Sequence, residues 1–100
     1  MITINPQKLA GVLLPKLIDA VQQHMDAAAK ALGYDDIKSA VTYAEEPSVP
    51  KFQQEGQAFR AWRSQCWAAG YVVLSQVEAG QRPVPTAAEL IAELPELVLP

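Results

Sequence analysis

The chain has 100 residues, of which half are hydrophobic and 19% are charged. This length suits one packed domain over residues 1–100, and the composition is too apolar for a disordered chain. Cys66 is the single cysteine and His24 the single histidine, which excludes an internal disulfide and a cysteine-rich zinc site.

The charge is unevenly distributed. The formal net charge is −3, and residues 1–82 contain as many acidic as basic residues, so Glu89, Glu93 and Glu96 supply the imbalance. Nucleic acid is therefore an unfavoured partner, because binding the phosphate backbone requires clustered Lys and Arg. The longest uncharged run, residues 64–77, is shorter than the ~20 residues of a membrane-spanning helix. We expect a soluble protein with no membrane partner.

Two helices are predicted in the first half. The first covers residues 15–32, where Leu17, Val21 and Met25 begin an apolar stripe at helical spacing and Gly33 fits the left-handed position after a helix. The second covers residues 36–45, with Asp35 as its N-cap.

The third predicted helix is the longest, over residues 52–79, and ends at Gly80. Trp67 and Leu74 widen its apolar face, which indicates contact with two other helices. Gly56 suggests that the helix could start instead near residue 57, and Gly70 suggests close approach of a neighbouring helix.

The two ends of the chain are apolar. Thr86 and Glu89 form a capping box before a short fourth helix, residues 87–94. The apolar residues that follow, Leu97, Val98 and Leu99, are expected either to pack against the domain or to bind a partner. Residues 1–14 are expected to form a flexible arm or an arm that binds a partner. Ile2 and Ile4 alternate as in a strand, whereas Leu9, Val12 and Leu13 could form one helical turn. The fold class is all-α, with three main helices and a short C-terminal helix.

No residue set predicts catalysis, a metal site or a cofactor site. His24 has no second histidine and no zinc-ligand spacing, so we interpret it as a residue at the boundary of the core. Cys66 has no neighbouring base and is interpreted as a buried small residue. The adjacent carboxylates at 35–36 and 45–46 point in different directions on a helix and suit caps or solvent.

The most distinctive patch is Arg60, Trp62 and Arg63, with Trp67 one turn further on. It fits three roles. Arg63 could lie along an indole and pair with Asp35 or Asp36 as a structural anchor. The patch could be a partner interface, where Arg and Trp are enriched, or it could stack on nucleic-acid bases.

The same region carries a resemblance. The runs Ala58-Phe-Arg-Ala-Trp-Arg63, Val77-Glu-Ala-Gly-Gln-Arg-Pro-Val-Pro-Thr86 and Glu89-Leu-Ile-Ala-Glu-Leu-Pro95 resemble small phage and prophage proteins encoded among tail and tail-fibre genes. Gly33-Tyr-Asp-Asp-Ile-Lys-Ser-Ala40 and Tyr43-Ala44 are also similar, and the similarity covers residues 24–95.

The resemblance implies a non-enzymatic protein that binds phage tail or tail-fibre proteins, as an assembly chaperone or a minor structural part. It implies residence in the bacterial host cytoplasm, with incorporation in the virion as a further option, and it is compatible with a homo-oligomer. The expected mechanism is hydrophobic docking through residues 9–14, residues 97–99 or both. The alternative is a small helical regulatory or nucleic-acid-binding protein that uses Arg60, Trp62 and Arg63.

Overall fold

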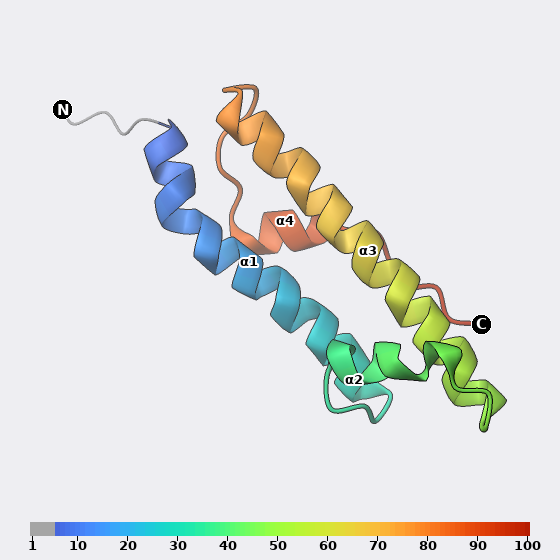
Figure 1. Cartoon of the computed structure of the whole chain (residues 1–100). Helices are drawn as coiled ribbons and strands as arrows, with labels where there is room; N and C mark the ends of the chain where they lie inside the picture. The colour runs from blue at the N-terminus through green and yellow to red at the C-terminus, as the bar shows by residue number, and fades with distance from the viewer. Residues whose placement is uncertain (1–5) are drawn as a thin grey trace.

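The computed structural model describes the backbone of residues 6–100 and the side chains from Leu14 onward. The described chain is all-α, with α1 (Pro6–Ala31), α2 (Ile37–Val41), the 3-10 helix η1 (Thr42–Glu45), α3 (Pro50–Glu78) and α4 (Ala87–Glu93). Figure 1 shows α1 and α3 running antiparallel along the long axis, with α2 at one end and α4 between them. The molecule measures 61 × 20 × 17 Å, and the expected fold class is confirmed.

The helix boundaries differ from expectation in two places. α1 begins at Pro6, nine residues before the expected start, and continues through Pro15. The expectation was wrong because an interior proline costs a helix about 3 kcal/mol without necessarily ending it. The single α-helix expected over residues 36–45 is instead a short α-helix, α2, followed directly by the 3-10 helix η1. Ile2 and Ile4 lie outside the described residues.

The caps of the helices are largely those the sequence predicts. Gly33 and Gly80 adopt positive φ angles of 96° and 73° after α1 and α3. The Thr86 hydroxyl accepts from the Glu89 amide, and the Glu89 carboxylate accepts from the Thr86 amide. The N-cap of α2 is Asp36 rather than Asp35, because Asp36 is three residues before the Ser39 amide that donates to it at 2.7 Å. The hydrogen bond from the Ser39 amide lowers the pKa of the Asp36 carboxyl group.

The core runs between the two long helices. Its fully buried members include Val21 and Met25 of α1, Ile37 of α2, and Phe59 and Cys66 of α3. Leu90 of α4 and Leu94, which directly follows α4, complete the same cluster. No helix within residues 6–100 is long and apolar enough to cross a membrane.

A hydrogen bond joins the C-terminal segment, defined as residues 95–100, to this core. Trp62 is 3% exposed, and its indole Nε1–H donates to the carbonyl oxygen of Pro95 at 2.7 Å. His24 packs edge-on against the Trp62 ring at 5.6 Å, in agreement with its interpretation as a boundary residue. The bond fixes the point at which the C-terminal segment leaves α4.

Gly56 lies where α3 meets α2 and η1. A Cβ atom at this position would come within 2.6 Å of the Ala44 amide nitrogen and 2.9 Å of the Ala40 carbonyl oxygen. Both are backbone atoms, so only glycine fits. At Gly70 the same Cβ would meet nothing within 4 Å. The expectation that Gly70 admits a close helix was therefore wrong, as was the suggestion that the helix starts after Gly56.

We predict opposite outcomes for two otherwise identical substitutions in α3. Gly56→Ala should lower the free energy of unfolding by about 3 kcal/mol, because the new methyl group overlaps backbone that must move. Gly70→Ala should raise it by about 0.5–1 kcal/mol through helix propensity. Urea denaturation of both variants measures the difference, and equal effects would contradict the close approach at Gly56.

The buried thiol provides a second prediction. Burial raises the pKa of Cys66 to about 11, so at pH 8 the thiolate is scarce as well as inaccessible. Labelling of the native protein with a thiol reagent should be slower than labelling of the urea-unfolded chain by about 100-fold or more. The native rate should keep rising with pH above 9. A native rate near the unfolded rate would show that Cys66 is not buried in solution.

Candidate binding groove

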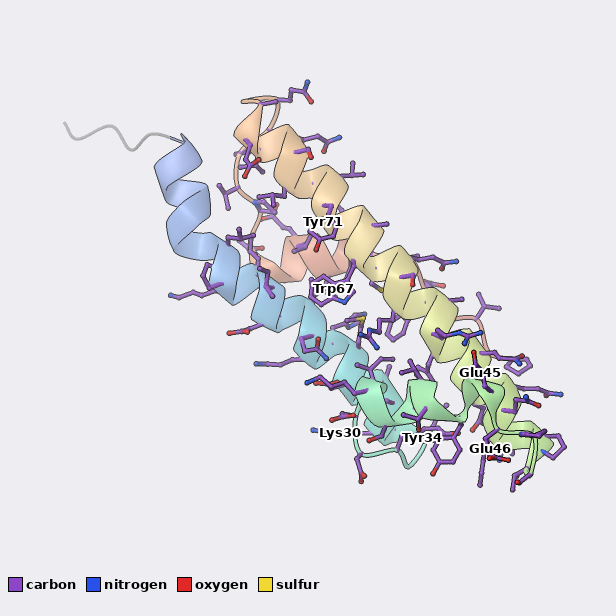
Figure 2. All side chains as sticks on the ribbon, in the orientation of Figure 1. Lys30, Tyr34, Glu45, Glu46, Trp67 and Tyr71 are labelled. Atoms are coloured by element: carbon purple, nitrogen blue, oxygen red, sulfur yellow. The ribbon has the colours of Figure 1, made fainter. Side chains whose placement is uncertain are left out.

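An apolar groove lies between residues 14–21 of α1 and residues 67–77 of α3. Val84, Pro85 and Leu90 form its third wall, and its volume is about 140 Å³. The lining side chains are apolar apart from the hydroxyl of Tyr71 and the indole N–H of Trp67. Figure 2 shows Trp67 and Tyr71 projecting from α3 on the side that faces α1.

The groove is present because the covering elements do not extend along the whole length of α1 and α3. α2 and η1 pack against the N-terminal part of α3, around Gly56. The groove lies about three to six turns further along α3, beyond their reach (Figure 1). α4 supplies Leu90 to one wall but leaves the rest open.

Large apolar side chains are exposed beside this opening. Tyr71 is 67% exposed and Ile18 45% exposed, and both line the groove. A single exposed apolar residue is ordinary, but exposed apolar residues on two walls of one hollow are typical of an interaction site. Gly70 also lines the groove, and the free space around it means that a larger side chain there would fill the hollow.

A second, open hollow adjoins the groove and is cationic. It is lined by Arg60, Arg63, Ser64 and Ala68, and it shares Trp67 and Tyr71 with the groove. Arg60 pairs with Glu45 at 3.1 Å, but both side chains are largely exposed, so the pair adds little stability. Arg63 is half-buried and makes no ion pair within the described part of the chain.

The structure separates the residues of the Arg–Trp patch. Trp62 is part of the core, whereas Arg63 lies at the cationic end of the groove. The expected pairing of Arg63 with Asp35 or Asp36 is absent from the ion pairs of residues 6–100. The Asp36 carboxylate accepts from Ser39 at the start of α2 instead. That cap, rather than an arginine, satisfies the charge of Asp36.

The apolar ends of the chain are placed as follows. The side chains of Leu9, Val12 and Leu13 lie outside the described residues, although their backbone belongs to α1. Leu97 packs against the core, whereas Val98 is 80% and Leu99 41% exposed. Within residues 6–100, no group of three or more His, Cys, Asp or Glu side chains could hold a metal ion.

Sequence reasoning missed most of the groove. Ile18, Gly70 and Tyr71 gave no signal of a shared hollow, because their association depends on where α2 and η1 end. One signal was present: Trp67 and Leu74 widen the apolar face of α3, and both line the groove. The expected contact of this face with two other helices is present, because residues of α1 and Leu90 of α4 line the same groove.

Comparisons with known proteins leave the chain without an assigned relative. No family model, curated protein or solved structure matches it.

Proposed function

We propose that this protein is a non-enzymatic, phage tail-associated protein that binds other tail components through the apolar groove. It acts as an assembly chaperone or as a minor structural part, in the cytoplasm of the bacterial host and, if retained, in the virion. The observation that carries the proposal is the open groove, with Ile18 and Tyr71 exposed at its edge. The phage tail assignment rests on the resemblance of residues 24–95.

The lining of the groove suits docking better than chemistry. Catalysis by proton transfer requires a titratable side chain within hydrogen-bond reach of the substrate. Among the described side chains, Tyr71 is the only titratable residue that lines the groove, and the thiol of Cys66 is buried elsewhere in the core. Burial of apolar side chains, worth about 1.5–3 kcal/mol for each large residue, is the interaction that such a surface provides.

The shape of the groove also indicates the form of the partner. The walls are two helices, and the groove continues the layer that α2 and η1 occupy at the Gly56 end. A segment of a tail protein with apolar side chains on one face would occupy this place. An acidic residue at its end would meet Arg63 in the adjoining hollow.

The nucleic-acid alternative has less support from the geometry. Of the residues on which it depends, Trp62 is buried and Arg60 is paired with Glu45. Arg63 and Trp67 remain, and one arginine beside one indole is a small electrostatic footprint for a phosphate backbone.

We predict that Ile18→Asp abolishes partner capture. The tagged protein should recover tail or tail-fibre proteins, identified by mass spectrometry, from a lysate of bacteria that produce the phage or prophage particle. Ile18→Asp should reduce recovery at least about tenfold, because it places a charge at the edge of an apolar site.

Leu32→Asp is the matched control for that experiment. Leu32 is 41% exposed, close to the 45% of Ile18, but it lies in the turn directly after α1, far from the groove. Its recovery should equal that of the unaltered protein. Recovery of nucleic acid alone, or equal losses in both variants, would contradict the proposed function.

A further inference from the structure

We propose that the groove of one molecule also binds the C-terminal segment of a second molecule of the same chain, so that the free protein associates head to tail. This inference rests on the proposed function in one respect, since both assign binding to the same groove. It names a specific occupant: the side chain of Val98 inside the groove, with Glu96 beside Arg63.

The C-terminal segment presents an unmatched apolar surface. Val98 is 80% exposed and Leu99 41% exposed, whereas Leu97 holds the segment against the core. Figure 1 shows this segment passing behind α3 and ending on the side of α3 away from α1. It does not reach the groove of its own molecule while Trp62 holds Pro95. A second molecule provides the accessible groove.

Charge complementarity favours this occupant. Glu93 pairs with Arg82, and Glu89 belongs to the capping box. Glu96 is exposed and makes no ion pair within the described residues. Arg63, at the cationic end of the groove, is likewise without an ion pair there. The one unmatched acid of the C-terminal segment therefore meets the unmatched base beside the groove.

The spacing of these groups also agrees. An extended chain advances ~3.4 Å per residue, which places Val98 about 7 Å and Leu99 about 10 Å beyond Glu96. A helix rises 1.5 Å per residue, which places Trp67 about 6 Å and Gly70 about 10 Å beyond Arg63. With Glu96 at Arg63, Val98 lies level with Trp67, and the backbone of Leu99 lies level with Gly70. Alternate side chains of an extended chain point the same way, so Glu96 and Val98 both face the groove while Leu97 faces its own core. The groove of about 140 Å³ accommodates the side chain of Val98.

The contact joins two different surfaces, so it leaves a free groove at one end and a free segment at the other. Such heterologous contacts extend into open chains or close into rings. The purified full-length protein should therefore show a mass that rises with concentration in sedimentation experiments. Val98→Asp, which alters only the segment, and Gly70→Leu, which fills only the groove, should each sediment as a monomer.

Gly70→Leu also controls for misfolding. Its Cβ has free space, and leucine is the better helix former, so the variant should melt at or above the temperature of the unaltered protein. A folded Gly70→Leu variant that remains monomeric supports occupation of the groove. A folded variant that associates as strongly as the unaltered protein overturns it.

Mixing the two variants provides the decisive experiment. The Val98→Asp molecule retains a groove and the Gly70→Leu molecule retains a segment, so an equimolar mixture should form a one-to-one complex. A monomeric unaltered protein at all concentrations, association that survives Val98→Asp, or a mixture that stays monomeric would each overturn the inference. Association that survives Val98→Asp would identify a symmetric dimer in which the two grooves face each other.

A charge exchange tests the register. Arg63→Glu and Glu96→Arg should each weaken association by about two- to fivefold, as expected for an exposed ion pair. The double variant should recover it. No recovery would overturn the assigned register of Glu96 at Arg63.

Failure of this inference is distinguishable from failure of the proposed function. Val98→Asp should capture tail proteins as the unaltered protein does, whereas Gly70→Leu should not. If self-association is absent while capture still depends on Gly70, the inference fails and the proposed function stands. If self-association follows the predicted pattern but no tail protein is captured, the inference stands and the proposed function fails.

Discussion

The backbones of α3 and of the α2–η1 segment approach each other at Gly56 more closely than any other residue type would allow. This contact sets where the short helices lie along the two long ones. It is supported by the aromatic rings of Tyr34, Tyr43 and Phe52, whose centroids lie 5.5–6.5 Å apart. The Tyr34 hydroxyl also donates to Glu55 at 2.7 Å. With α2 and η1 held at that end, the opposite end of the two-helix layer keeps its apolar groove.

The sequence predicted those features that depend on near neighbours in the chain. The capping box at Thr86 and the left-handed glycines at 33 and 80 follow from local hydrogen bonding and backbone freedom, and all are present. The continuation of α1 through Pro15 could not be predicted, because packing further along the helix outweighs a local cost. The close approach of a neighbouring element was assigned to Gly70, whereas it occurs at Gly56, for a similar reason. Both lie in the same helix, and only the position of α2 and η1 distinguishes them.

In the candidate site too, features that depend on near neighbours in the chain were predictable, whereas those that depend on distant packing were not. Arg60, Trp62 and Arg63 are adjacent in sequence, yet one pairs with Glu45, one lies in the core and one borders the groove. Helical geometry turns consecutive residues to different sides, so a cluster in sequence is not a cluster in space. The residues that do meet in the groove come from α1, α3, α4 and the segment around Pro85. No spacing rule connects them.

The hydrogen bond between Trp62 and Pro95 has a consequence for the order of events during synthesis. The indole donor leaves the ribosome 33 residues ahead of its acceptor. In that interval α1 and α3 can already pair, but Trp62 lacks its partner and Leu90 has not yet closed its side of the core. A nascent chain at this stage exposes more apolar surface than the finished protein, and such surface is what general folding factors bind. The segment that follows α3 thus completes the core.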